Sequence, residues 1–311
     1  MPGQTVQKTR FSKPTLHFRY AGLTNTGLLR DHNEDAYRLP EDADADTLQR
    51  KGHLYVLADG MGGHEKGEVA SAITIEIVNA EYYATLTQLD EQNPEEAITN
   101  ALTQAIQKAN NEVMDVTEGG GTTVVAAVLH GDMLVAVNVG DSRAYLLRDR
   151  TLKQLSRDHS LVSRLVELGK ITEEEALTHP RRNVLYQALG QGTDVEIHIA
   201  SERLQADDVI ILCSDGLWGE VAELAITEVI ANANSPLAAT EQLIKLANAS
   251  GGPDNITAII IQVSNQEEAH HESATLDNDN PDDTKPSTKI NLEKPKTLPE
   301  GKYHVDSGNG S

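Results

Sequence analysis

The stretch HLYVLADGMGGHEKGE, residues 53–68, has the pattern of a buried strand that ends at a carboxylate and is followed by unusual backbone freedom. An apolar run precedes Asp59, and glycines stand at 60, 62, 63 and 67. A strand end with a tight turn is one interpretation, because Asp-Gly is a common turn dipeptide and glycine supplies the positive φ that such turns need. The alternative is that Asp59 binds a cation, while the bare backbone at Gly60 lets a carbonyl oxygen and a substrate come close.

Carboxylates stand beside apolar runs at several other places, which favours the second interpretation. The run VIILCSDGLWGE, residues 209–220, again ends in Asp-Gly. If the strands converge, these like charges repel one another unless cations lie among them. Carboxylate and carbonyl oxygens are hard ligands, so the sequence favours Mg²⁺ or Mn²⁺ over zinc. The acids in this pattern are Glu34, Asp35, Asp59, Asp141, Asp215 and Asp254.

The composition predicts a globular enzyme of the cytoplasm. At 311 residues the chain can bury a sizeable core, as one domain or two modest ones. A formal charge of −22 without a dense Lys/Arg stripe argues against a nucleic-acid partner. The single cysteine, Cys213, excludes an intramolecular disulfide, and its apolar neighbours predict a small core residue. No run approaches the ~20 apolar residues that span a bilayer and no secretory leader is recognisable, so we expect a cytoplasmic protein with no membrane partner. We also expect the chain to be a monomer.

Composition also divides the chain into three parts. Residues 1–14 form a short, basic, flexible lead, residues 15–264 a globular body, and residues 265–311 an acidic, proline-containing tail. The tail has few large apolar residues. Because burial of so few cannot offset the entropy lost on ordering, we expect the tail to be disordered.

Within the body, apolar periodicity predicts strands grouped in hairpins and helices grouped in pairs. The links Gly131-Asp132 and Asp149-Arg150 are short enough for hairpins, so the central strands are expected to be antiparallel. This order indicates an α+β layered sandwich and not a parallel doubly wound sheet. The β-like runs are 16–23, 53–58, 122–130, 133–140, 143–148, 195–201, 208–214 and 256–263, and the helical patterns are 69–80, 98–113, 222–233 and 236–250.

Seven short motifs occur in order along the body. They are Arg30-Asp-His-Asn-Glu-Asp35, Asp59-Gly-Met-Gly-Gly-His64, Gly121-Thr-Thr, Gly140-Asp-Ser-Arg143, Asp158-His-Ser160, Ser214-Asp-Gly-Leu217 and Asp254-Asn255. Together they resemble the motif set of the PPM family, the metal-dependent protein serine/threonine phosphatases also called type 2C, in its bacterial form. The resemblance covers nearly all of residues 16–264. It implies a four-layer sandwich of two antiparallel β-sheets flanked by pairs of α-helices, with a two-metal site at one edge.

The resemblance also implies which residues hold the first of two Mn²⁺ or Mg²⁺ ions. Asp59 would bridge both ions, and the carbonyl oxygen of Gly60 would ligate one of them. Asp215 and Asp254 would complete the shell of the first ion. The glycine after Asp59 would then be needed to leave its backbone oxygen unobstructed.

Further roles follow from the same resemblance. Asp35 would order the waters of the second ion, with Glu34 acting through water. Asp141 resembles the residue that helps to hold a third, weaker ion in bacterial members. Arg30 would present its planar guanidinium to the substrate phosphate.

The implied reaction is hydrolysis of phosphoserine and phosphothreonine in proteins by a metal-bridged hydroxide, without a covalent phosphoenzyme. Eukaryotic members tend to have a histidine directly after Asp-Gly, where it is thought to protonate the leaving oxygen, whereas Met61 stands there in this chain. His64 is the candidate general acid, with a metal-bound water or a merely local hydrogen-bonding role for His64 left open. For His159 we expect a structural role.

The segment 160–192 corresponds in this resemblance to a flap that borders the catalytic cleft. Its apolar spacing predicts a short helix, and Thr172 to Glu175 predicts a capping box that starts another. We expect phosphorylated proteins as partners, among them serine/threonine kinases and their substrates. Two alternatives stay open: a catalytically silent member that only binds phosphoproteins, and another two-metal phosphoesterase.

Overall fold

The computed structural model describes residues 15–62, 65–86, 89, 93–117 and 119–265. The predicted lead, nearly all of the predicted tail, and His64 lie outside the described residues. Every described helix and strand lies between His17 and Ser264. None of the described helices combines the length and the apolar character needed to cross a membrane.

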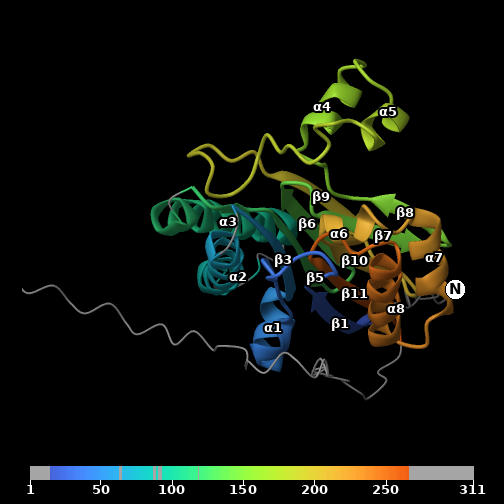
Figure 1. The fold of residues 1–311 in the computed structure, drawn as a ribbon. Helices are drawn as coiled ribbons and strands as arrows, with labels where there is room; N and C mark the ends of the chain where they lie inside the picture. Colours follow the sequence, from blue (N-terminus) through green and yellow to red (C-terminus); the bar gives the residue numbers. More distant parts are fainter. Residues whose placement is uncertain (1–14, 63–64, 87–88, 90–92, 118, 266–311) are drawn as a thin grey trace, which may run out of the picture. The chain divides into compact units, whose positions relative to one another are not determined.

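The strands form two antiparallel sheets (Figure 1). One sheet has the order β1-β11-β10-β7-β8, and the other has the order β2-β3-β5-β6-β9 with β4 paired to β3. The first sheet comprises β1 (His17–Asn25), β7 (Arg143–Arg148), β8 (Thr151–Gln154), β10 (Val209–Cys213) and β11 (Ile256–Ser264). The second comprises β2 (Asp35–Arg38), β3 (His53–Met61), β4 (Gly121–Thr122), β5 (Val124–His130), β6 (Met133–Val139) and β9 (His198–Arg203).

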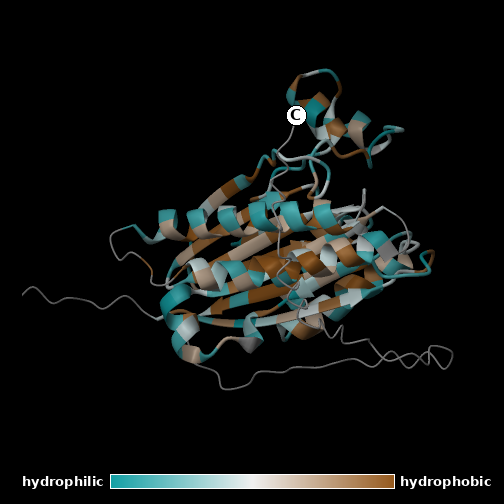
Figure 2. Cartoon of the chain, turned by 90° about the vertical axis from the view of Figure 1, so that its left-hand side faces the viewer, coloured by the Kyte–Doolittle hydropathy of each residue, from teal (hydrophilic) through white to brown (hydrophobic). Residues whose placement is uncertain are grey.

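Helices cover the outer face of each sheet, which makes four layers (Figure 1). The long helices α2 (Glu65–Thr85) and α3 (Pro94–Thr117) pack on each other and share one apolar cluster with the sheet that contains β3. The other sheet is covered by α6 (Asp215–Trp218), α7 (Glu223–Asn232) and α8 (Pro236–Ala249). A further cluster fills the space between the sheets, and Figure 2 shows apolar strands beneath helices with hydrophilic outer faces. The predicted α+β sandwich is therefore confirmed.

Strand β3 shows why the opening stretch is a continuous apolar run. Leu54 and Val56 pack against the helical layer, whereas Tyr55 and Leu57 pack between the sheets. Successive side chains of a strand point to opposite faces, so a strand covered on both faces has no side for polar residues. The apolar run ends at Asp59, which is only partly buried.

The two predicted hairpins are confirmed. Gly131-Asp132 joins β5 to β6, and Asp149-Arg150 joins β7 to β8 with φ values of 49° and 61°, as a two-residue hairpin turn requires. The sequence did not predict β2 or α1 (Ala45–Lys51). Strand β2 has four residues, too few to show a period, and α1 buries none of its side chains, so it has no apolar stripe. The strand expected at 195–201 lies instead at His198–Arg203.

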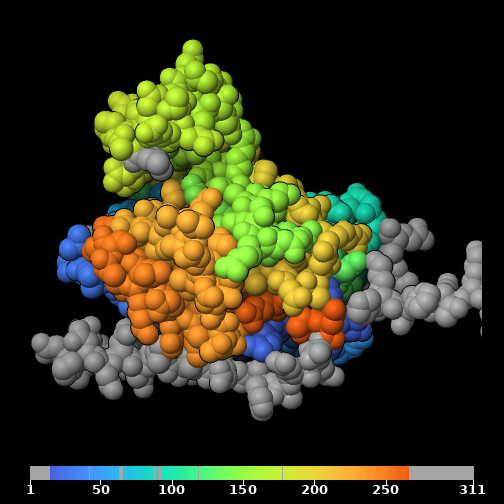
Figure 3. Space-filling model, turned by 90° about the vertical axis from the view of Figure 1, so that its right-hand side faces the viewer, coloured from blue at the N-terminus to red at the C-terminus, as the bar shows by residue number. Residues whose placement is uncertain are grey.

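The segment 160–192 contains the two short helices that its sequence predicts. Helix α4 (Leu161–Glu167) begins after Ser160, whose side chain accepts a hydrogen bond from the Ser163 amide. Helix α5 (Glu173–Leu177) begins with the predicted capping box between Thr172 and Glu175. Figure 3 shows this yellow-green segment standing out from the layered part of the chain.

We predict that a chain ending at Asn265 keeps the melting temperature of the full chain. The reason is that every described helix and strand precedes this residue. Calorimetry on the two chains checks the prediction. A melting temperature lower by more than a few degrees would show that the removed residues stabilise the body.

Candidate active site

The two sheets bring their acids together at one edge of the sandwich. Asp35 opens β2 and is paired across the ladder with Asp59 of β3. Asp215 is the first residue of α6 and is separated from the end of β10 only by Ser214, and Asp254 stands two residues before β11. Hydroxyl groups at the ends of β10 and β11 donate hydrogen bonds to Asp35, so these strand ends meet in space.

Asp35 is the residue at which the sheets join. Its Oδ2 accepts hydrogen bonds from Ser214 Oγ at 2.8 Å and from Thr257 Oγ1 at 2.6 Å. Ser214 Oγ in turn accepts from the Thr257 amide at 2.9 Å. The other oxygen, Oδ1, is buried and makes no hydrogen bond within the described residues. A buried carboxylate oxygen without a donor is suited to a cation or an ordered water.

The Gly-Thr-Thr motif fixes the backbone of Asp59. The Asp59 carbonyl accepts from Thr122 Oγ1 and from the Thr123 amide, both at 2.8 Å. The Asp59 amide donates to Thr123 Oγ1 at 3.1 Å, and Thr123 Oγ1 lies 2.6 Å from Ser142 Oγ. With both backbone groups held, the direction in which the Asp59 side chain leaves the strand is set.

Gly60 is required by a close approach of three backbone segments. A Cβ atom at this position would lie 2.2 Å from the carbonyl oxygen of Gly67 and 2.6 Å from that of Glu34. A Cβ atom at Gly67 would lie 2.6 Å from the carboxylate of Glu34. The glycines after Asp59 therefore let the first turn of α2 pack directly on the end of β3, beside the Glu34 side chain.

Asn255 fastens the segment that carries Arg30 to the end of β11. Its side-chain amide donates to the carbonyls of Thr26 and His32, and its Oδ1 accepts from the Glu34 amide. Arg30 Nη2 donates to Asp254 Oδ2 at 2.7 Å, in an ion pair that is partly exposed. An arginine and an aspartate from opposite ends of the sequence are thus held side by side.

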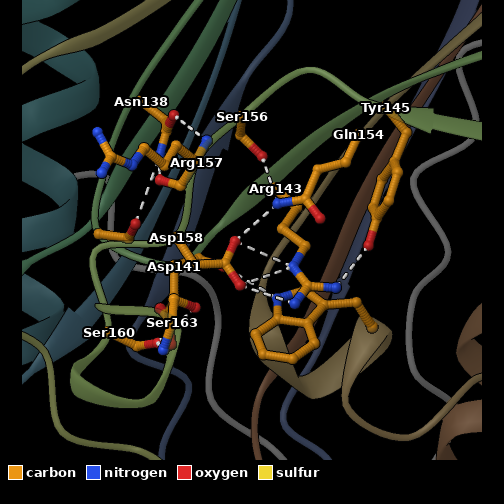
Figure 4. Close-up of polar contacts among 12 residues, drawn as sticks. Asn138, Asp141, Arg143, Tyr145, Gln154, Ser156, Arg157, Asp158, Ser160 and Ser163 are labelled. Atoms are coloured by element: carbon orange, nitrogen blue, oxygen red, sulfur yellow. Dashed lines mark hydrogen bonds and ion pairs between the residues drawn. The ribbon is translucent and has the colours of Figure 1, made fainter. Parts of the chain in front are cut away.

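A second polar network holds the loop of Asp141 (Figure 4). Trp218 Nε1 donates to the Asp141 carbonyl at 3.0 Å, and the guanidinium of Arg143 stacks on the Trp218 ring at 3.6 Å from its centroid. Arg143 also donates through Nε and Nη2 to the buried carboxylate of Asp158, and through Nη1 to Tyr145. The arginine therefore ties α6, β7 and the start of the flap to the loop of Asp141.

His159 and Cys213 have structural positions, as the sequence predicts. His159 is fully buried, its Nδ1 accepts from the Gly140 amide at 3.2 Å, and burial lowers the pKa of the imidazole. The acceptor role of Nδ1 places the proton of this neutral ring on Nε2. Cys213 is buried in the cluster beneath α6 to α8, where burial raises the pKa of its thiol to about 12. Neither side chain is prepared for proton transfer or nucleophilic attack.

The gathered carboxylates ionise with difficulty. Burial raises the pKa of Asp35 from 3.8 to about 7, and the nearby Asp215 and Asp254 add to the shift. Burial and then Asp254 raise the pKa of Asp215 to about 6, although Arg30 opposes this. Burial and neighbouring acids also raise the pKa values of Asp59 and Asp141 well above their ordinary value. This is the pattern expected of acids that lie among like charges in a poorly solvated place.

The donor set fits a hard divalent cation. All the candidate ligands are oxygens, Asp35 Oδ1 is buried without a donor, and the remaining acids repel one another. Within the described residues, no group of three or more His, Cys, Asp or Glu side chains has the arrangement to hold a metal ion as it stands.

The structure brings together the sequence-predicted site residues that it describes. Asp35, Asp59, Asp215, Asp254 and Arg30 interact with one another electrostatically. Asp141 joins them through Asp215 and Asp59. Gly60 follows Asp59, and His64 lies outside the described residues. Four supports of the site were not predicted from the sequence, although all of them lie in or beside the recognised motifs or strands: Ser214, Thr257, Arg143 and Trp218.

We predict that Arg143→Met lowers the free energy of unfolding by about 3 kcal/mol, because it leaves the buried carboxylate of Asp158 without its main ionic partner. Chemical denaturation measures this loss. The double variant with Asp158→Asn should lose less than the sum of the two single variants. Arg203→Met, which breaks a largely exposed pair with Asp132, is the matched control and should cost less than about 1 kcal/mol. Equal losses for the two arginines would contradict the buried role of Arg143.

Comparison with known proteins gives the family. A family model for protein phosphatase 2C matches residues 31–250. The serine/threonine phosphatase stp of Listeria monocytogenes is 37% identical over 245 residues, which cover 77% of this chain and 93% of that protein.

Solved structures agree with this match. The serine/threonine phosphatase Stp1 from Staphylococcus aureus is 33% identical with a TM-score of 0.71, over 82% of this chain and 98% of that one. A catalytic domain of serine/threonine phosphatase PstP in complex with two manganese ions is 36% identical with a TM-score of 0.66, over 80% and 100% of the respective chains. The chain belongs to the protein phosphatase 2C family and is a metal-dependent protein serine/threonine phosphatase.

Proposed function

We propose that this phosphatase uses two Mn²⁺ or Mg²⁺ ions to dephosphorylate phosphoserine and phosphothreonine in cytoplasmic proteins, among them serine/threonine kinases and their substrates. The observation that carries the proposal is the gathering of Asp35, Asp59, Asp215 and Asp254 at one edge of the sandwich, with Arg30 beside them. We further propose that the chain acts as a monomer, which a strongly negative net charge favours through mutual repulsion of copies.

The proposed ligands divide between the ions. Asp59 would be shared between the ions, because it interacts electrostatically with the acids of both sheets. The Gly60 carbonyl, Asp215 and Asp254 would hold the first ion. Asp35 would hold the second through its unpaired Oδ1, with Glu34 acting through water.

Asp141 is proposed to hold a third, weaker ion. Asp141 interacts electrostatically with Asp215, and its backbone carbonyl accepts a hydrogen bond from Trp218. The PstP structure with two manganese ions supports the choice of metal. When bound, such ions supply Lewis acidity and lower the pKa of a bound water.

Arg30 is proposed to orient the phosphate. Its Nη2 already donates to Asp254, which leaves the rest of its planar donor group for a phosphate oxygen. This contact would keep the phosphorus beside the acids. His64 is proposed as the proton donor to the leaving oxygen, since it belongs to the same Asp-Gly-Met-Gly-Gly-His motif as Asp59.

The test separates metal binding from phosphate binding. Asp59→Asn conserves shape but removes the negative charge of the ligand and replaces one of its two oxygens with an NH2 group, so turnover of p-nitrophenyl phosphate should fall close to background at every substrate concentration. Arg30→Ala should raise KM and lower kcat/KM by about 10- to 100-fold, since charge-assisted hydrogen bonds contribute about 1.5–3 kcal/mol each. Steady-state kinetics at saturating Mn²⁺, with calorimetry of Mn²⁺ binding, provide the measurement.

Glu228→Gln is the control, because it neutralises an exposed carboxylate on α7 while keeping its shape. It should leave both kinetic constants and Mn²⁺ affinity unchanged. Wild-type kcat in Asp59→Asn would contradict the bridging role. Loss of Mn²⁺ affinity with unchanged KM in Arg30→Ala would contradict the phosphate role. Activity that survives exhaustive chelation with EDTA would contradict the metal site altogether.

We also predict that Mn²⁺ raises the melting temperature more at pH 8 than at pH 5.5. The folded-state pKa values of Asp35 and Asp215 are raised to about 7 and 6. Without metal, the stability linked to these groups is present below their unfolded pKa of 3.8 and is lost as the pH rises through 6 to 7. Cations replace the lost protons, so their stabilising effect grows over the same range. Scanning calorimetry at both pH values with and without Mn²⁺ tests this, and an equal shift at both would contradict it.

A further inference from the structure

Two large apolar side chains stand in solvent immediately before Arg30. Leu28 is 65% exposed and Leu29 is 73% exposed. A single exposed leucine needs no explanation, because much of any protein surface is apolar. Two consecutive exposed leucines next to the proposed phosphate-binding arginine form a small apolar surface at the edge of the active site.

The segment that carries these leucines is firmly held. The amides of Leu28 and Leu29 both donate to the Gly252 carbonyl, at 2.8 and 3.3 Å. The Gly27 amide donates to Asn25 Oδ1 at 2.9 Å, and the Asn255 side chain closes the segment from the other side through Thr26 and His32. The exposure of the leucines is therefore built into the fold and does not come from a loosely attached loop.

A glycine in the same segment shows how closely it approaches the site. Gly27 has a φ of 79°, and a Cβ atom there would lie 2.1 Å from the Asp254 carbonyl. Arg30 then pairs with the Asp254 side chain. The backbone of one proposed metal ligand thus lies close to the first residue of the Gly27–Arg30 segment, and its side chain pairs with the last, with the leucines between them.

The position of the leucines limits what can cover them. Leu28, Leu29 and Arg30 are consecutive in the sequence, and neighbouring Cα atoms along a chain are about 3.8 Å apart. The backbone of both leucines is therefore within about 8 Å of the Arg30 backbone. A polypeptide whose phosphorylated side chain reaches Arg30 would bring its flanking residues within reach of this surface. A flanking apolar side chain would remove both its own surface and that of a leucine from water.

We propose that Leu28 and Leu29 form a docking surface for an apolar side chain that flanks the phosphorylated residue of a protein substrate. The proposal rests on the proposed function and narrows it to a substrate class, phosphoserine or phosphothreonine segments with a nearby large aliphatic residue. Because the surface is continuous with the phosphate site, the occupant is the substrate itself and not a separate partner.

The experiment uses pairs of phosphothreonine peptides that differ only in having leucine or serine at one position, from three residues before to three after the phosphothreonine. At one or more positions the leucine peptide should have a kcat/KM about fivefold higher with the wild-type chain and Mn²⁺, as partial burial of one leucine side chain provides. The measured quantity is the leucine-to-serine ratio. Both values come from one preparation, so differences in folded or metal-loaded fraction cancel.

Leu28→Ser combined with Leu29→Ser should bring this ratio close to one, while Leu28→Met combined with Leu29→Met should retain it. Leu224→Ser is the matched control, because Leu224 is 72% exposed on α7. It should leave the wild-type ratio intact. A wild-type ratio of one at all positions, a preference that survives in the double serine variant, or an equal loss in Leu224→Ser would each overturn the docking surface. Those results would leave the proposed function standing, whereas failure to hydrolyse any phosphopeptide would contradict both.

Discussion

The repulsion among carboxylates gathered at the junction of the two sheets is the constraint on which the rest of the molecule depends. Asp35 and Asp59 are paired on neighbouring strands of one sheet, and Asp215 and Asp254 lie next to strand ends of the other sheet. The raised pKa values of Asp35, Asp59 and Asp215 mean that ionising these acids together costs free energy, which the apolar layers must offset. A fold that keeps this arrangement maintains a site whose natural complement is divalent cations, in agreement with the metal-dependent family to which the chain belongs.

Much of the surrounding structure serves to hold that arrangement. The apolar clusters between the four layers anchor β3, β10 and β11, so that the ends of these strands cannot separate. Hydroxyl groups join Asp35 to the opposite sheet, and Thr122 and Thr123 fix the backbone of Asp59. The Arg143 network ties the loop of Asp141 to the start of the flap. These polar contacts are buried or partly buried, and hydrogen bonds specify position most strongly where water is excluded.

The parts of the site that depend only on residues adjacent in the sequence could be predicted. Asp59 and Asp215 could be recognised because each ends an apolar run and precedes a glycine, and that pattern reflects the strand itself. The layers also followed from local periodicity, since covered strands such as β3 and β10 read as continuous apolar runs. Contacts that depend on how the sheets stack could not be derived, such as those from Ser214 and Thr257 to Asp35. The packing reason for Gly60 was likewise hidden, because it depends on Gly67 and Glu34 approaching from other segments. The exposed helix α1 left no apolar stripe to detect.

The most direct test of the central claim is a crystal structure of the Mn²⁺-soaked protein with anomalous diffraction recorded above and below the manganese absorption edge. The account predicts two strong anomalous peaks, one contacted by Asp59, Asp215 and Asp254 and the other beside Asp59 and Asp35, with a weaker peak near Asp141. Absence of peaks at these carboxylates, or peaks only at other surface acids, would contradict it.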